Sequence, residues 1–249
     1  MKVFAGEVVE DIPEGQYGGK ASNLAKLAAA GAEVPPGFAI AAGELPSRKD
    51  IDFLVYTVCG GYPVAVRSSA IGEDSTGQSF AGQYDTFLDV KNLSEVLKAI
   101  GKVRLSAKND RVSSYRESFQ LDSSGVGVVI QQMLRPYASG VMFTAEPVEG
   151  DDTLICIEEV AGLGDKLVSG QASPNMYIVD KATEVVVEET IIEEPVIGVD
   201  VLSQLVKAGK LIEEWFGCPQ DIEWAVTSRS KVARIHILQT RPVTTLTNI

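Results

Sequence analysis

The sequence has few of the residues that build metal centres or disulfide frameworks. It contains one histidine and three cysteines, and Cys59, Cys156 and Cys218 lie far apart without any CxxC pair. An odd number of widely spaced cysteines indicates neither a zinc site nor a set of disulfides. This usage of cysteine is typical of a reducing compartment, so we expect a cytoplasmic protein.

Long apolar runs and basic clusters are also absent from the sequence. No apolar stretch reaches the roughly 18 residues that a membrane-spanning helix needs, and the N-terminus turns acidic at Glu7, too early for a signal peptide. Acidic residues outnumber basic ones by 34 to 22, which gives a formal charge of −12. Because nucleic acids and anionic membranes are also negative, we expect neither of them as a partner.

What the sequence does have is an alternation of helical and β-like segments, in a chain whose 45% hydrophobic residues suffice for a good core. Apolar spacing predicts helices over residues 19–30, 93–115 and 199–216. Runs rich in β-branched residues predict strands at 126–134, 140–144, 153–158, 176–179 and 184–187, and a closing hairpin of 221–226 and 232–239. Strands in meander-like order with flanking helices favour an α+β fold over a doubly wound parallel sheet.

The most informative segment is an apolar run that leads into small, hydroxyl-rich residues. Val64 to Val66 indicate the end of a strand, and we expect a loop from Arg67 to Tyr84 because Ser, Gly, Asp and Thr dominate there. Small residues let backbone N–H groups approach an anion, and a guanidinium holds two phosphate oxygens at once. The segment therefore predicts a phosphate site at Arg67. The alternative is an ordinary surface loop that carries one arginine.

The closing hairpin is the second candidate site. Asp221 and Glu223 are two positions apart, so both carboxylates face the same side of a strand. Gln239 and Arg241 have the same spacing on the returning strand. These four side chains, opposed across a hairpin, suit Mg²⁺ that bridges polyphosphate oxygens. The alternative is a solvated strand face with an ordinary cross-strand ion pair, which contributes about 0.2–1 kcal/mol.

Two other features invite a functional interpretation that we do not favour. The single histidine, His236, lies in mid-strand between two isoleucines. We expect it to be a packed or surface histidine, because a phosphorylated histidine needs an exposed and mobile setting. The acidic run at residues 187–194 predicts the solvated edge of a strand or loop rather than a metal site.

Six ordered motifs run through most of the chain. They are Gly18-Gly-Lys20-Ala-Ser-Asn-Leu with Val34-Pro-Pro-Gly-Phe; Val64-Ala-Val-Arg67-Ser-Ser-Ala with Ser79-Phe-Ala-Gly82-Gln; Val129-Ile-Gln-Gln132-Met-Leu134 with Ser139-Gly-Val-Met-Phe-Thr144; Gly162-Leu-Gly-Asp165-Lys-Leu-Val-Ser-Gly170 with Pro174-Asn-Met-Tyr177; Asp221-Ile-Glu223-Trp; and Ile237-Leu-Gln239-Thr-Arg241-Pro242. In this order they resemble the N-terminal ATP-binding domain of the phosphoenolpyruvate synthase and pyruvate phosphate dikinase family, which rifampin phosphotransferase shares.

The resemblance implies an α+β fold of the ATP-grasp type, with two lobes of mixed or antiparallel sheet, flanking helices, and the nucleotide between the lobes. We expect the lobes at residues 1–133 and 134–249. ATP and Mg²⁺ are the cofactors that the resemblance implies. The phosphate contacts it implies are Lys20, Arg67 and the loop from Ser79 to Gly82, and the adenine contacts are Gln132, Met133 and Leu134. The implied metal ligands are Asp221 and Glu223, and the residues acting on the transferring phosphoryl group are Arg67, Gln239 and Arg241.

Three departures limit the resemblance. Only 23 residues separate Ile40 from Val64, where the family usually has a longer helical segment, and Asp165 stands where glutamate is usual. The sequence also contains neither a swivelling phosphohistidine domain nor a pyruvate-binding barrel. The resemblance therefore implies a kinase-type phosphotransferase that passes phosphate from ATP to a histidine on a separate chain, with a small molecule such as pyruvate as final acceptor. The alternatives are an ATP-sensing subunit without turnover and an isolated domain of a larger synthase.

Overall fold

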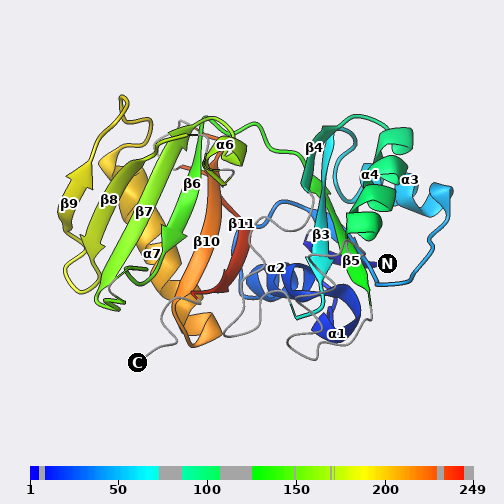
Figure 1. The fold of residues 1–249 in the computed structure, drawn as a ribbon, viewed down its shortest axis with the longest axis horizontal. Coiled ribbons are helices and arrows are strands. Elements are labelled where there is room, and N and C mark those ends of the chain that lie inside the picture. The colour runs from blue at the N-terminus through cyan, green and yellow to red at the C-terminus, as the bar shows by residue number, and fades with distance from the viewer. Residues whose placement is uncertain are drawn as a thin grey trace. The chain divides into compact units, whose positions relative to one another are not determined.

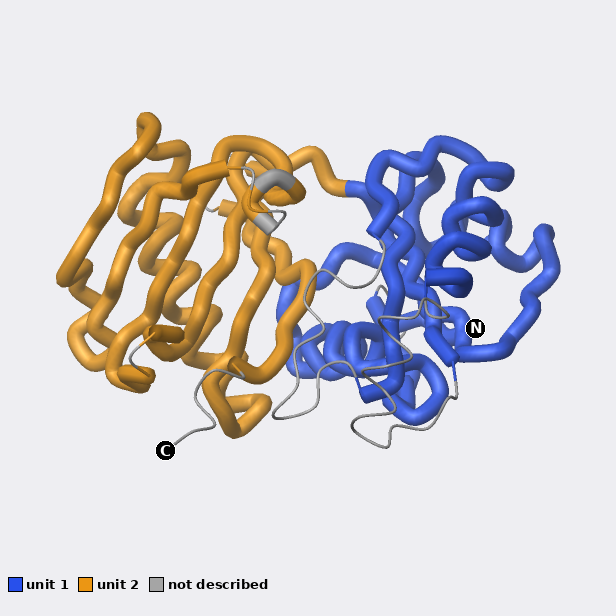
Figure 2. The backbone as a smooth tube through the Cα atoms, in the orientation of Figure 1, with its two compact units in different colours: residues 1–133 blue, residues 134–249 orange. Residues whose placement is uncertain are grey.

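The computed structural model describes residues 1–5, 9–72, 86–106, 125–148, 150–168, 170, 172–228 and 233–243. The chain divides into two compact units, Met1–Met133 and Leu134–Ile249 (Figure 2). Each unit combines one sheet with helices, and all strand pairs in the described part of the chain are antiparallel. The expected α+β class is thereby confirmed.

Unit 1 is built on a five-stranded sheet with the order β1-β2-β5-β3-β4. Its strands β3, β4 and β5 are labelled in Figure 1. The strands are β1 (Lys2–Ala5), β2 (Gly37–Ile40), β3 (Val64–Ala70), β4 (Thr86–Val90) and β5 (Val126–Gln132). The helices are α1 (Glu14–Tyr17), α2 (Gly19–Ala29), α3 (Arg48–Thr57) and α4 (Leu93–Ser106). Helix α2 is followed by Gly31, whose φ of +95° is the left-handed conformation typical of a residue just past a helix end.

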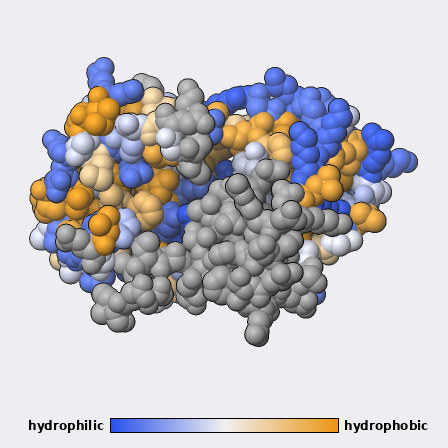
Figure 3. Space-filling view, in the orientation of Figure 1, coloured by the Kyte–Doolittle hydropathy of each residue, from blue (hydrophilic) through white to orange (hydrophobic). Residues whose placement is uncertain are grey.

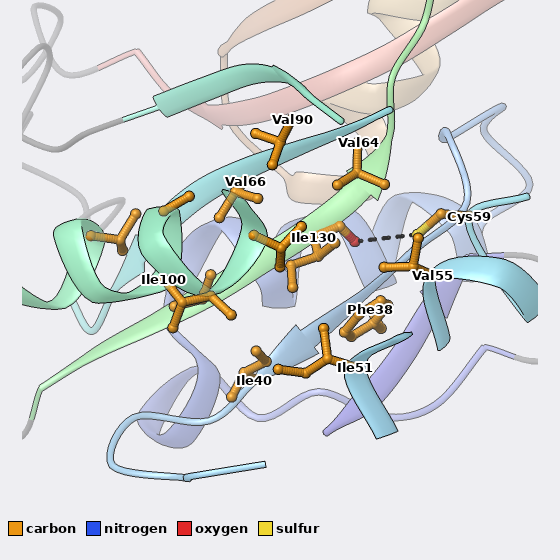
Figure 4. Close-up of a cluster of buried hydrophobic side chains, with 14 of the residues drawn as sticks. Phe38, Ile40, Ile51, Val55, Cys59, Val64, Val66, Val90, Ile100 and Ile130 are labelled. Carbon is orange, nitrogen blue, oxygen red and sulfur yellow. Dashed lines mark hydrogen bonds between the residues drawn. The ribbon is translucent and has the colours of Figure 1, made fainter. Parts of the chain in front are cut away.

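The core of unit 1 lies between α3, α4 and one face of this sheet (Figure 4). Strand β3 contributes Val64 and Val66, and β5 contributes Val128 and Ile130, all without exposed surface. Burying each such side chain stabilises the fold by about 1.5–3 kcal/mol. Since successive strand residues face opposite sides, Arg67 points away from this core, toward the face that α2 covers.

Unit 2 is built on a six-stranded sheet with the order β11-β10-β6-β7-β8-β9. The strands are β6 (Ala138–Phe143), β7 (Leu154–Ala161), β8 (Asn175–Asp180), β9 (Val186–Thr190), β10 (Gln220–Val226) and β11 (Ile235–Pro242). The helices are α6 (Asp165–Val168) and α7 (Val199–Phe216). Strand β9 is an edge strand with every residue exposed, which confirms the expected solvated position of the acidic run.

Helix α7 packs across one face of the unit 2 sheet (Figure 1). Its buried stripe includes Leu205, Val206 and Ile212. Gly209 allows close approach, because a Cβ there would lie 2.9 Å from the sulfur of Met142. The helix ends at Gly217 in the left-handed conformation. The opposite face of the sheet carries the residues of the expected metal site.

The structure corrects part of the expected secondary structure. Strand β3 continues to Ala70, so the loop expected to start at Arg67 was wrong. Ser68 and Ser69 are buried, and β3 pairs with β5 along its full length, which satisfies their backbone groups. Strand β9 starts at Val186 rather than at Glu184, because Glu184 adopts a positive φ in the preceding turn. Residues 107–115 of one expected helix lie outside the described residues.

Six elements were not predicted at all: β1, β2, β4, α1, α3 and α6. Helix α7, by contrast, occupies residues 199–216 as expected. Among the described residues, no helix combines the length and apolar character that a membrane crossing requires. On the face in view, Figure 3 shows hydrophilic residues interspersed with hydrophobic ones among the described residues.

Candidate functional site

The first turn of α2 rests directly on β3. Gly18, which precedes the helix, has a φ of +85°, and a Cβ on it would lie 2.1 Å from the carbonyl oxygen of Ser69. The backbone N–H of Ala21 donates a hydrogen bond to Ser69 Oγ at 3.0 Å. Arg67 precedes Ser69 by two residues, so both side chains lie on the same face of the sheet. The structure therefore brings Lys20, in the first turn of α2, and Arg67 to one side of unit 1.

A second glycine completes this close approach, and the sequence analysis missed it. A Cβ on Gly127 of β5 would lie 2.2 Å from the carbonyl oxygen of Tyr17, at the end of α1. The junction of α1 and α2 thus packs against the backbone of β3 and β5. A signal was present, because a glycine inside a β-branched run such as 126–130 often marks close backbone contact.

The three residues expected at adenine follow the end of β5. Gln132 is the last residue of the strand, and its N–H donates to the carbonyl oxygen of Pro36 at 2.8 Å. Met133 and Leu134 lie just beyond it, and all three side chains are partly exposed. They are accessible to a ligand, unlike the buried residues that precede them. Ser79 and Gly82, expected to cover the phosphates, lie outside the described residues.

In unit 2 the strand register brings the four expected residues together. Asp221 of β10 pairs with Arg241 of β11, and Glu223 pairs with Gln239. Because each pair is two positions from the next, all four side chains share the face opposite α7. Arg241 Nε donates to Asp221 Oδ2 at 2.8 Å, and Arg241 Nη2 lies 2.7 Å from the same oxygen.

Burial and charge act against each other at Asp221. Burial raises the pKa of this carboxyl, Arg241 opposes the rise, and the charge of Glu223 adds to it. A carboxylate in this setting is stabilised by any further positive charge, and a divalent cation supplies it.

Glu158 of β7 is a third carboxylate on this face, and the sequence analysis missed it. It pairs with Val141, which in turn pairs with Glu223 on the other side of β6. Burial raises the pKa of Glu158, and the negative charge of Asp221 raises it further. Sequence alone did not reveal this neighbour, since it depends on the strand order β10-β6-β7.

Asp221 and Glu223 could supply part of the ligands of a magnesium ion. Within the described ranges, no three His, Cys, Asp or Glu residues are grouped so that they could hold a metal by themselves. Mg²⁺ is commonly bound by one or two carboxylates, with phosphate oxygens and water as the remaining ligands. Asp221 and Glu223 match that requirement, because they share one face and one strand.

His236 is a packed histidine, as expected. Its side chain is buried in β11, and its Nε2 lies 2.9 Å from the hydroxyl of Thr227. A histidine that accepts and passes on a phosphoryl group has to reach two reaction partners. The buried position of His236 does not allow that.

Comparison with known proteins places these features in context. A family model described as "Pyruvate phosphate dikinase, AMP/ATP-binding domain" matches residues 51–200 and 193–249. A rifampicin phosphotransferase from a Streptomyces species is 38% identical over 206 residues, which cover 73% of this chain and 23% of that protein. A probable phosphoenolpyruvate synthase from Archaeoglobus fulgidus is 36% identical over 208 residues, which cover 74% of this chain and 27% of that protein.

The chain thus spans about a quarter of the length of these two relatives. Among solved structures, an acetyl-coenzyme A synthetase from Candidatus Korarchaeum cryptofilum aligns with a TM-score of 0.49 at 13% identity, over 89% of this chain and 90% of that one.

Proposed function

The chain belongs to the pyruvate phosphate dikinase family of AMP/ATP-binding domains, and on that premise we propose that it transfers phosphate from Mg²⁺-bound ATP to a histidine on a separate chain. The observation that carries the proposal is the register of β10 and β11. It places Asp221, Glu223, Gln239 and Arg241 on one sheet face. Phosphoryl transfer depends mainly on positioning and charge neutralisation, and these four side chains supply both.

In this proposal the residues of unit 2 act on the transferring group. Asp221 and Glu223 would hold Mg²⁺, which when bound neutralises charge on the polyphosphate. Gln239 donates from its amide to a phosphate oxygen. Arg241 offers a second charged donor, and its existing contact with Asp221 fixes the direction of its guanidinium.

The residues proposed to bind the phosphates and adenine belong to unit 1. Lys20 and Arg67 neutralise the phosphates from the α2 side of the sheet. The loop from Ser79 to Gly82 covers them, and Gln132, Met133 and Leu134 contact adenine, as the family resemblance implies. The support from this unit is that Gly18 and Gly127 bring the start of α2 onto β3 and β5.

The phosphate acceptor in this proposal is a histidine of a partner protein. The only histidine of this chain is buried, and the carboxylates Asp221 and Glu223 are assigned to the metal. A swivelling phosphohistidine domain supplied in trans meets the need, with a small molecule such as pyruvate as the final acceptor. The cytoplasm provides ATP and suits the three free cysteines.

Label transfer tests this function directly. The chain is mixed with ATP labelled in the β-phosphate, Mg²⁺ and a separately expressed swivelling-histidine-domain protein. In the step tested here, the partner's histidine attacks the β-phosphorus and AMP leaves, so the β,γ-pyrophosphoryl group moves to the histidine. We expect label on the partner's histidine together with released AMP, and no transfer by Arg67→Ala. Arg48→Ala, which removes an exposed cation of α3, is the matched control and transfers normally. Label on His236, or ATP binding without any transfer, contradicts the proposal, and the second result favours an ATP-sensing subunit.

A further inference from the structure

Three buried polar side chains cross-link the strands that carry the unit 2 site. Thr144 follows β6, Gln220 begins β10 and Thr240 lies in β11, and none of them has exposed surface. The backbone N–H of Gln220 donates to Thr144 Oγ1 at 2.8 Å, and Thr240 Oγ1 donates to Gln220 Oε1 at 2.8 Å. A further hydrogen bond of 2.8 Å runs from Thr144 N–H to the carbonyl oxygen of Gln220.

The side-chain amide of Gln220 closes this network. Its Nε2 donates to the carbonyl oxygens of Cys218 and Pro219 at 3.1 and 3.3 Å. The amide nitrogen therefore serves as a donor to these carbonyl oxygens, and the amide oxygen serves as an acceptor for Thr240. A glutamate of the same shape would place a carboxylate oxygen against two carbonyl oxygens, and an apolar residue would remove the acceptor of the Thr240 hydroxyl. The network specifies an amide at this position.

Each member of the network is next to Asp221, to Arg241, or to the residue of β6 that pairs with Asp221. Asp221 follows Gln220, Arg241 follows Thr240, and Phe143, which precedes Thr144, pairs with Asp221. Neighbouring strand residues face opposite sides, so the network lies on the α7 face beneath the ion pair. The position of Thr144 agrees, since its methyl group would lie 3.4 Å from a Cβ on Gly209 of α7.

The register of this short segment needs its own support. A bulge between Glu223 and Trp224 interrupts the pairing of β10 with β11. The pairing on the far side of the bulge therefore does not determine how Asp221 meets Arg241. A one-residue slip would turn the side chains of either strand to the other face. A fully satisfied buried polar network opposes such a slip, because any other register leaves buried groups unpaired.

We propose that Thr144, Gln220 and Thr240 form a positioning clamp, which holds Asp221 and Arg241 in the alignment that ATP requires. The clamp touches no substrate and acts through the ion pair above it. Its role in ATP use rests on the proposed function, whereas its effect on the ion pair does not.

Isosteric variants in the intact chain test the clamp. Thr240→Val removes the hydroxyl and keeps the shape, and Thr240→Ser keeps the hydroxyl. Ile222→Val is the matched control, because it trims a fully buried apolar neighbour on the same face. The readouts are the Arg241 Nε–H signal in NMR spectra without nucleotide, the affinity for Mg²⁺-ATP by calorimetry, and the melting temperature.

We expect Thr240→Val to shift and broaden the Arg241 signal and to weaken Mg²⁺-ATP binding by roughly ten- to a hundredfold, in line with the effect of misplaced site residues. Thr240→Ser restores both, and Ile222→Val lowers the melting temperature without changing either. A folded Thr240→Val chain with the parent's Arg241 signal and affinity would overturn the proposal.

Thr144→Val keeps the test decisive if Thr240→Val does not fold. It removes only the side-chain acceptor of the Gln220 N–H, and we expect the same change in the Arg241 signal. An unchanged signal in this variant contradicts the clamp. If the parent itself does not bind Mg²⁺-ATP, the proposed function fails, while the NMR comparison still decides whether the clamp positions Arg241.

Discussion

Asp221 and Arg241 form a cross-strand ion pair whose carboxylate is more deeply buried than its guanidinium. The Oδ2 atom of Asp221 lies 2.8 Å from Nε and 2.7 Å from Nη2 of Arg241. The side chains are 11% and 26% exposed, respectively. Each partner of this pair has a separate part in the proposed reaction, and the ion pair holds both side chains in a common orientation.

Because the two side chains are buried to different extents, we expect their substitution by alanine to lower the free energy of unfolding by different amounts. Arg241→Ala leaves a buried carboxylate without its cation, so it should lower the free energy of unfolding more than Asp221→Ala does. A double-mutant cycle should give a coupling of about 0.5–3 kcal/mol. The exposed pair Lys210 and Glu184 is the matched control, with an expected coupling of about 0.2–1 kcal/mol at most. Equal couplings in urea unfolding would show that burial does not strengthen the Asp221 pair.

Glu158 predicts a pH dependence with a definite sign. Burial, and then the charge of Asp221, raise its pKa above the ordinary glutamate value of about 4.3. The folded state therefore disfavours ionisation of Glu158. The stability that the protonated carboxyl contributes is complete below the ordinary glutamate pKa, and it is lost as the pH rises through the pKa of the folded state. Glu158→Gln cannot ionise and avoids this loss.

The melting temperature of Glu158→Gln should consequently rise relative to the parent between about pH 4 and pH 7. Differential scanning fluorimetry across that range measures the difference. Glu188→Gln, on the exposed strand β9, controls for the removal of one negative charge from the same sheet. A difference that shrinks toward neutral pH would contradict the assigned cause.

We expect substitution of Gly18 by alanine to destabilise the fold, and substitution of Gly31 provides the comparison. Both Gly18 and Gly31 have a positive φ, but a Cβ on Gly31 meets nothing within 4 Å. Gly31→Ala should therefore cost only the left-handed strain of about 1–2 kcal/mol. Gly18 lies at φ +85° and ψ 166°, a region that only glycine adopts readily, and an added Cβ also overlaps Ser69, so Gly18→Ala should cost about 1–3 kcal/mol more. It should also weaken ATP binding, because the overlap moves the first turn of α2. Equal losses in the two variants would exclude the close contact.

Local signals in the sequence were sufficient for part of this structure. The apolar stripe of residues 199–216 and the following Gly217 predict α7 with its correct ends. The spacing of Asp221 and Glu223 predicts their common face, because alternation is a property of any strand. The same alternation on the returning strand predicts the partners Gln239 and Arg241, which the strand register does place opposite them.

Features set by distant parts of the chain were not predictable in this way. Ser68 and Ser69 are weak strand formers, and they lie in β3 because β5 pairs with it from a remote part of the sequence. Glu158 joins the carboxylate face only through the order of three strands. The buried role of Gln220 depends on threonines from two other segments. None of these relationships leaves a local pattern.

Substitution of a proposed phosphate-binding residue or of a proposed metal ligand should weaken nucleotide binding to a similar extent. Arg67→Ala and Glu223→Ala should each weaken Mg²⁺-ATP binding by about 1.5–3 kcal/mol, the contribution of a charged hydrogen bond, or roughly ten- to a hundredfold. The matched controls are Arg48→Ala on α3 and Glu188→Ala on β9, both exposed in the structure. Thermal shifts over a nucleotide series measure the loss. If the site variants bind like their controls, the residue assignment is wrong.

The most direct test of the account is a calorimetric titration of Mg²⁺-ATP into the purified chain, with melting curves recorded at the same nucleotide concentrations. The account predicts saturable heat from a single site and a melting temperature that rises with nucleotide, because binding confined to the folded state stabilises it by mass action. Neither heat nor a melting shift at millimolar Mg²⁺-ATP would contradict the assignment of this chain as an ATP-binding phosphotransferase module.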